Sequence, residues 1–238
     1  FPRIAGKPAG YLFEQLRSFR DGRRSYPPMA GLLADLDDDY LREIAGHFAS
    51  LRLAYPPPQA PQAPQRSVST LARGRVLALE GDPSGDVPAC TECHGRALTG
   101  AAPAIPGLLG LSRDYLNAQL GAWRDGLRHA AAPDCMAELA QRLQPEDVAA
   151  LTGWLAAQPV PVGDVPHADP GARLPMRCGS VEAEAPAAQS AAPAAASHGG
   201  ATLPAPAGAG QVARGAYLAR AGNCMGCHTA RGAAPYAG

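Results

Sequence analysis

The sequence carries no net charge, because 21 lysine and arginine residues balance 21 aspartate and glutamate residues. It therefore offers no electrostatic reason to bind nucleic acid or an anionic membrane surface. Aromatic residues make up only 5% of the 238 residues, whereas glycine and proline number 27 and 25. This composition argues against one well-packed core over the whole length and indicates that part of the chain is linker.

Long apolar runs are also missing, since none approaches the ~18–20 residues that span a bilayer. The sequence opens with Phe1-Pro2-Arg3, which is neither an initiator methionine nor the start of a targeting segment. We expect the chain to be a piece of a longer protein. Membrane association through missing segments therefore stays open.

Four of the six cysteines belong to two C-x-x-C-H motifs. The motifs consist of Cys90, Cys93 and His94, and of Cys224, Cys227 and His228. This spacing is typical of covalent haem c attachment, in which both thiols join the haem and the histidine ligates its iron. A zinc ribbon would place its two pairs ~15–20 residues apart, whereas Cys93 and Cys224 are 131 positions apart. Zinc or dithiol redox chemistry is the weaker alternative.

The chain contains an internal repeat. An offset of 104 aligns residues 2–24 with residues 106–128, and after a three-residue insertion Met29 aligns with Met136. An offset of 141 aligns the segments that lead into the two motifs, Ala72-Arg73-Gly74 and Ala213-Arg214-Gly215. These matches predict a first unit without its motif, a complete second unit and the opening of a third.

Helical periodicity predicts an all-α fold. The expected helices are Pro8–Arg20, Asp38–Leu53, Leu71–Glu80, Ser112–Asp125 and Pro145–Ala157. Gly22 and Gly126 are expected to end equivalent helices, and no alternating strand pattern is apparent. The segment from Glu182 to Gly210 is almost entirely Ala, Pro, Gly and Ser, which predicts a disordered linker.

The repeated residues resemble the tandem di-haem class I cytochromes c, the c4 subgroup. The likeness is carried by Pro2-Arg3-Ile4-Ala5-Gly6, Tyr11-Leu12, Gln15-Leu16, Phe19 to Arg24 and Met29, and by Pro88 to Gly95, Tyr115 to Arg128 and Met136. It covers about residues 1–158. Residues 211–238 resemble instead the opening of the cytochrome subunits of membrane-bound alcohol dehydrogenases.

The resemblance implies tandem small helical domains, each folded around a haem. The implied divisions are 1–58 for the rest of a first domain, 66–160 for a complete domain, 161–210 for a mostly disordered linker and 211–238 for the start of a third domain. His94 and Met136 would be the iron ligands of the middle haem. Met29 would ligate a first haem whose motif lies upstream of residue 1, and His228 a third haem whose Met lies beyond Gly238.

Cys135 and Cys178 remain once the haem cysteines are assigned. In an oxidising compartment they are expected to form a disulfide, and two free thiols are the alternative.

The implied function is single-electron relay in the periplasm, on or near the cytoplasmic membrane, between a donor dehydrogenase and an acceptor such as a terminal oxidase or another cytochrome. The chain would then be an electron carrier or cytochrome subunit rather than an enzyme in its own right, with no catalytic residue. The enzyme alternative is a multi-haem peroxidase with an open iron position, for which His129 and Asp134 would be the candidate acid–base groups. A redox sensor based on the two remaining cysteines is a third reading, supported by nothing beyond their presence.

Overall fold

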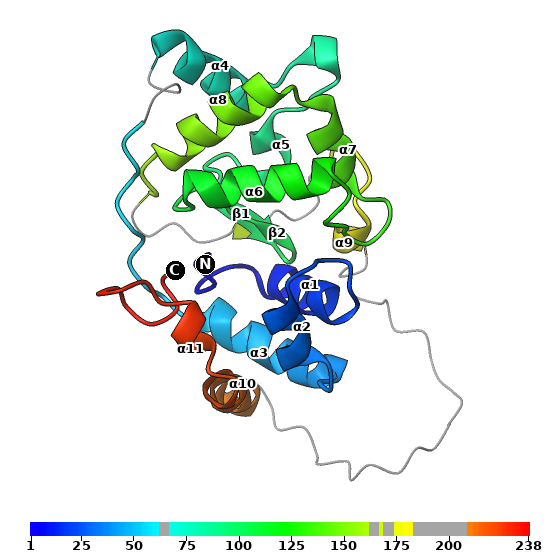
Figure 1. Cartoon of the computed structure of the whole chain (residues 1–238), viewed down its shortest axis with the longest axis vertical. Helices are drawn as coiled ribbons and strands as arrows, with labels where there is room; N and C mark the ends of the chain where they lie inside the picture. The colour runs from blue at the N-terminus through cyan, green and yellow to red at the C-terminus, as the bar shows by residue number, and fades with distance from the viewer. Residues whose placement is uncertain (62–66, 162–166, 169–173, 183–208) are drawn as a thin grey trace.

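The computed structural model describes residues 1–61, 67–161, 167–168, 174–182 and 209–238. These residues are mainly helical and form two bundles, which Figure 1 shows one above the other. The upper bundle consists of α4 (Val68–Leu79), the 3-10 turn η1 (Pro83–Gly85), the one-turn α5 (Cys90–His94), α6 (Arg113–Arg124), α7 (Cys135–Arg142) and α8 (Pro145–Ala156). The lower bundle consists of α1 (Ala9–Arg20), α2 (Pro27–Leu33), α3 (Asp38–Ser50), α10 (Ala209–Ala221) and α11 (Cys224–Cys227). The short α9 (Gly179–Glu182) lies near α7 (Figure 1).

The sequence repeat reappears as a repeat of helices. The offset of 104 relates the ends of α1 to the ends of α6, and both helices stop at the same position before Gly22 and Gly126. These glycines have φ values of +74° and +65°, a left-handed conformation that favours glycine after a helix. The expected helices are therefore confirmed, with ends that shift by no more than three residues. None of the described helices is long and apolar enough to cross a membrane.

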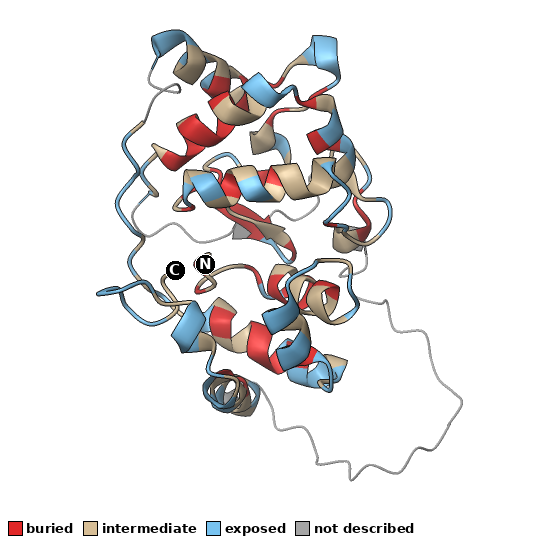
Figure 2. Ribbon diagram, in the orientation of Figure 1, coloured by how far each residue is buried: buried red, intermediate tan, exposed pale blue. Residues whose placement is uncertain are grey.

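Each bundle has its own apolar core, seen as red ribbon in Figure 2. In the upper bundle, α4 packs against α8 and buries Leu77, Leu151 and Leu155. In the lower bundle, α10 packs against α3, and Ala219 is fully buried beside Leu41. The helix that leads into a C-x-x-C-H motif, α4 or α10, thus packs against equivalent helices, α8 or α3, in the two bundles.

Three short strands were not expected from the sequence. β1 (Gly100–Ala102) pairs antiparallel with β2 (Ile105–Pro106) and parallel with β3 (His167–Ala168), in the order β2-β1-β3. Strands of two or three residues are too short to produce a recognisable alternation of apolar and polar positions.

The C-terminal segment lies against the first unit. Residues 211–238 are expected to open a third domain, and in the structure their helices α10 and α11 lie against α1–α3 (Figure 1). Cys224, which is 195 positions after Met29, thereby packs against the core of the first unit. Most of the expected linker, 161–210, lies outside the described residues.

Candidate haem-binding sites

The first motif lines an apolar cavity in the upper bundle, here called the α5 cavity. Cys90, Cys93 and His94 line this cavity together with Met136, which lies in the first turn of α7. Burial raises the pKa of the Cys90 thiol to about 12 and that of Cys93 to about 11. Dithiol redox motifs depend on the opposite shift, a lowered thiol pKa. These two cysteines are thus poorly suited to that alternative.

The orientation of His94 is fixed by a proline carbonyl. His94 is 8% exposed, and its ring Nδ1 lies 2.7 Å from the carbonyl oxygen of Pro106. A carbonyl oxygen only accepts hydrogen bonds, so Nδ1 carries the proton and Nε2 keeps its lone pair. Burial lowers the pKa of His94, which also favours the neutral ring. A neutral imidazole oriented in this way is suited to bind a metal.

The second motif lines a larger cavity of about 550 Å³ in the lower bundle, here called the α11 cavity. Cys224, Cys227 and His228 reach it from the C-terminal segment, and Met29 reaches it from α2. The sequence assigned Met29 and His228 to different haems, and the structure instead brings them to one cavity.

His228 repeats the geometry of His94. Its Nδ1 lies 3.1 Å from the carbonyl oxygen of Pro2, and Pro2 is the residue equivalent to Pro106. Burial lowers the pKa of His228 too. Both motif histidines therefore present an unprotonated Nε2 to their surroundings.

A cluster of polar side chains is shared by the two cavities. Arg24 donates to Gln15 Oε1 at 3.0 Å and to Gln119 Oε1 at 2.7 Å. Arg128 donates to the same two oxygens, at 2.7 Å and 2.6 Å. All four residues line the α11 cavity, and all but Arg24 also line the α5 cavity. We call these residues the Arg–Gln cluster.

The Arg–Gln cluster is a test of fit for haem. Arg128 is 4% exposed, and within the described ranges neither arginine forms an ion pair with a carboxylate. Burying a cation without a counterion is costly. The two propionate carboxylates of haem would supply the missing negative charge, so the cluster fits this cofactor.

An unpartnered indole supports the same fit in the α5 cavity. Trp123 lines that cavity, and its buried Nε1 has no hydrogen-bond partner among the described residues. A buried N–H without an acceptor costs about 1–3 kcal/mol, which a carboxylate would recover. The α5 cavity itself measures about 170 Å³, so its fit to haem rests on these donors rather than on volume.

The structure joins Cys135 and Cys178 in a disulfide. This bond holds residues 176–181 against the loop before α7, where Gly179 N donates to Pro133 O at 2.9 Å. Met176 consequently lines the α5 cavity together with Met136. From the sequence, Met176 and Met225 are not expected to be ligands, because they lack the repeat context of Met29 and Met136. The available signal for the position of Met176 is Cys178, two residues later.

The groups named for a peroxidase are not arranged for acid–base chemistry. His129 is exposed and does not line the α5 cavity. Asp134 lines it, but its two carboxylate oxygens accept hydrogen bonds from the backbone N–H groups of Ala130 and Ala137, at 2.6 and 3.0 Å. Asp134 thus serves as the N-cap of α7.

From the sequence, two roles are open for Arg20, Arg24, Arg124 and Arg128: they stabilise haem propionates or they are exposed to solvent. Arg24 and Arg128 belong to the Arg–Gln cluster, whereas Arg20 pairs with Asp38 at 2.8 Å and Arg124 donates to the Leu143 carbonyl. Only the first pair is placed to meet an anionic group in the cavities.

A substitution of Met136 tests its proposed role as an iron ligand. We expect Met136→Ala to lower the reduction potential of the haem at Cys90 and Cys93 by on the order of 0.1 V or more, because methionine ligation raises this potential and axial ligands span ~0.8 V. Redox titration followed by absorbance measures the change. Met225→Ala is the matched control, because Met225 is 49% exposed. An unchanged potential in Met136→Ala would leave Met176 as the candidate ligand.

Comparison with known proteins places this geometry in a family. Thiosulfate dehydrogenase electron acceptors from Thiomonas intermedia and Stutzerimonas stutzeri are 36% and 39% identical to the chain, over 67% and 66% of it and 71% and 70% of their own length. Cytochrome c4 from Pseudomonas aeruginosa is 32% identical over 65% of the chain and 74% of its length. No protein-family model matches.

Solved structures agree with these relatives. A thiosulfate dehydrogenase from Marichromatium purpuratum matches with a TM-score of 0.57 and 35% identity, covering 66% of this chain but only 33% of that one. Reduced cytochrome c4 from Pseudomonas stutzeri matches with a TM-score of 0.56 and 27% identity, over 66% of this chain and 84% of that one. The all-α fold of tandem cytochrome domains is thereby confirmed, and the chain belongs to the di-haem class I cytochromes c, the family of cytochrome c4.

Proposed function

We propose that this chain relays single electrons through two haem c groups, one in each cavity. The observation that carries the proposal is the repetition of a complete donor set: two cysteines, a histidine oriented by a proline carbonyl and a methionine line each cavity. Haem bound there supplies an iron that alternates between its ferric and ferrous states.

The side chains have distinct roles in this proposal. The motif cysteines would hold each haem through thioether bonds. His94 and Met136 would be the iron ligands of one haem, and His228 and Met29 those of the other. Haem held in this way would have no open position for a substrate, so the chain would act as a carrier rather than as an enzyme.

The Arg–Gln cluster would set the electrostatics between the two sites. Its guanidinium groups would neutralise the propionate carboxylates of the haems, which would otherwise be unpaired charges in a poorly hydrated interior. Because Arg128 contacts glutamines of both bundles, the cluster also fixes the distance and orientation of one cavity relative to the other. A fixed separation favours direct transfer of an electron from one haem to the next.

We further propose that the electron donor is a dehydrogenase that oxidises thiosulfate. Two relatives are named as electron acceptors of such an enzyme, and a thiosulfate dehydrogenase structure contains a region similar to this chain. The acceptor would be a terminal oxidase or another cytochrome. A disulfide and haem thioethers both suit the periplasm, an oxidising compartment, where we place the protein.

One experiment tests cofactor and donor in sequence. The full chain is produced with haem-attachment machinery, and its intact mass is measured under non-reducing conditions. We expect the mass of two haems, and then rapid reduction of both, followed by absorbance, when a thiosulfate dehydrogenase and thiosulfate are added. A mass gain of zero would contradict the carrier proposal. A loaded protein that ascorbate reduces, but the dehydrogenase does not, would contradict the donor alone.

A further inference from the structure

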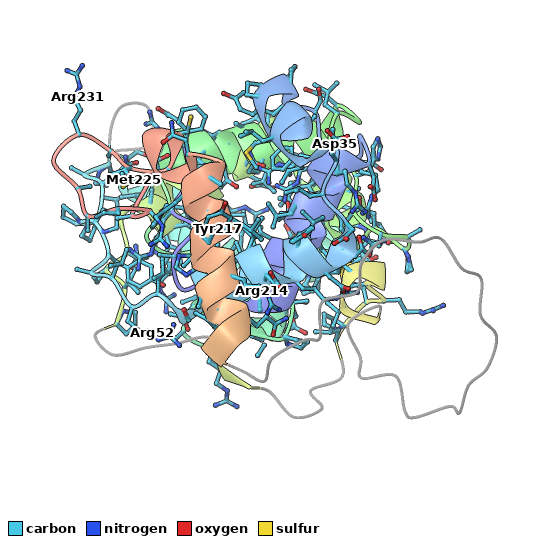
Figure 3. The ribbon with its side chains drawn as sticks, turned by 90° about the horizontal axis from the view of Figure 1, so that it is seen from below. Asp35, Arg52, Arg214, Tyr217, Met225 and Arg231 are labelled. Carbon is cyan, nitrogen blue, oxygen red and sulfur yellow. A yellow bond between two sulfur atoms is a disulfide. The ribbon has the colours of Figure 1, made fainter. Side chains whose placement is uncertain are left out.

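The α11 cavity is built from residues near both ends of the chain. Leu16 and Phe48 reach it from the N-terminal segment, and Cys224 and His228 reach it from the C-terminal segment. Figure 3 shows α10 and α11 from below, with α10 running across the lower bundle and Tyr217 on its outer side. Tyr217 is 65% exposed, so the opposite face of α10 makes the contact with α3.

The contact between α10 and α3 reproduces the contact between α4 and α8. A Cβ atom on Gly74 would lie 2.2 Å from the Ala150 carbonyl oxygen, and one on Gly215 would lie 2.0 Å from the Glu43 carbonyl oxygen. The offset of 141 relates the two glycines, and the offset of 107 relates Glu43 to Ala150. Both helix pairs therefore cross at equivalent residues, at a distance that only glycine allows.

An ion pair also joins the C-terminal segment to α3. Arg214 Nε donates to Glu43 Oε1 at 2.7 Å, and the side chain of Glu43 is only 8% exposed. A carboxylate buried to this extent needs a partner. Within the described residues, that partner comes from the C-terminal segment.

Gly238 meets Pro2 and Arg3 at a place that corresponds to continuous backbone in the upper bundle. An offset of 134 relates His228 to His94 and places Gly238 opposite Ala104, while the offset of 104 places Phe1 opposite Ile105. Ala104 and Ile105 are consecutive. In agreement, Gly238 packs against the backbone of Pro2 and Arg3, and Figure 1 shows the two termini side by side.

We propose that residues 1–50 and 209–238 of one chain form a single haem domain with permuted connectivity, in which the haem attached at Cys224 and Cys227 takes Met29 as its distal iron ligand. The inference rests on the proposed function, because it requires haem at these cysteines. It goes further in assigning one haem to two segments that the sequence separates by more than 150 residues. The histidine of this haem is oriented by Pro2, from the other end of the chain.

The test isolates this haem. Cys90→Ala/Cys93→Ala leaves haem only at Cys224 and Cys227, and a protease site is inserted between Glu182 and Ala209. In this background we expect Met29→Ala to abolish the long-wavelength absorption band of methionine-ligated ferric haem. Met225→Ala, within the same motif but half exposed, should keep the band. Met29→His should give a six-coordinate bis-histidine spectrum, which shows that the domain still folds around position 29.

Cleavage supplies a second readout that does not depend on any ligand variant. After proteolysis of the two-haem chain, we expect the fragment with residues 209–238 to carry one haem and to elute together with the fragment that holds residues 1–182, at the mass of one chain. Survival of the band in Met29→Ala, separation of the fragments without denaturant, or elution at the mass of two chains would each overturn the inference. Absence of haem at Cys224 and Cys227 would instead contradict the proposed function at this site.

Discussion

Replacing Gly215 with valine is expected to destabilise the lower bundle by about 3 kcal/mol or more, because the new side chain would collide with the backbone of α3. Its Cβ alone would lie 2.0 Å from the Glu43 carbonyl oxygen and 2.8 Å from the Cβ of His47. Backbone atoms in two packed helices cannot move aside as a flexible side chain can. The helices would have to separate, and the apolar faces around Ala219 and Leu41 would be exposed to water.

Gly74→Val is the corresponding change in the upper bundle and should have an effect of similar size there. Its Cβ would lie 2.2 Å from the Ala150 carbonyl oxygen and 2.8 Å from the Cβ of Trp154. Denaturant unfolding of the haem-loaded protein, followed through the absorbance of each haem, measures both variants. Gly46→Ala in α3 is the control, because a Cβ at Gly46 meets nothing within 4 Å, and it should stabilise the helix by ~0.5–1 kcal/mol. If Gly74→Val lowers stability and Gly215→Val does not, then α10 does not dock on α3 in solution.

The second large effect on stability is expected from removing the disulfide between Cys135 and Cys178. The bond closes a loop with a sequence separation of 43 residues. In the chain-entropy treatment, a loop of this length stabilises the folded state by ~4 kcal/mol. Cys135→Ser/Cys178→Ser should therefore unfold the upper bundle at markedly lower denaturant concentration, and the lower bundle at an unchanged one.

A thiol reductant provides the matched control for the disulfide. It should reproduce the effect of the double serine variant in the wild-type chain and add nothing to the variant itself, since haem thioethers are not cleaved by thiols. The loss of the bond also frees residues 176–181, so Met176 should leave the α5 cavity and the Met136 side should become accessible to small iron ligands such as cyanide. Equal stability with and without reductant would show that the remaining contacts, such as Gly179 N to Pro133 O, suffice to hold the segment.

The sequence was most informative where signals were local or repeated. Periodicity, start signals such as Ser112 and the paired glycines Gly22 and Gly126 located the helices of both units, because each signal acts within one helical turn. The cysteine spacing located both C-x-x-C-H motifs. Neither result required knowledge of which helices pack together.

Contacts between residues that are far apart in the sequence could not be predicted in the same way. Met29 and His228 lie at opposite ends of the sequence, and the residues between them contain a complete unit that already pairs its own helices. The matches of Pro2 with Pro106 and of Gly215 with Gly74 held the required information, but each can be used only after one knows that Pro106 contacts His94 and that Gly74 contacts α8. The position of Arg24 and Arg128 between the two cavities could not be predicted from the sequence for the same reason.

The distance in sequence between α3 and α10 has a consequence for the order in which the two bundles can assemble. The upper bundle is contiguous from α4 to α8, so its helices reach the compartment where haem is attached as one stretch of chain. α1–α3 precede that stretch and can pack on one another, but the face of α3 that contacts α10 stays exposed until the chain beyond α8 has followed. We therefore expect chaperones of that compartment to bind residues 1–50 of incomplete chains, and chains that end before α10 to contain a folded upper bundle and an incompletely packed lower bundle.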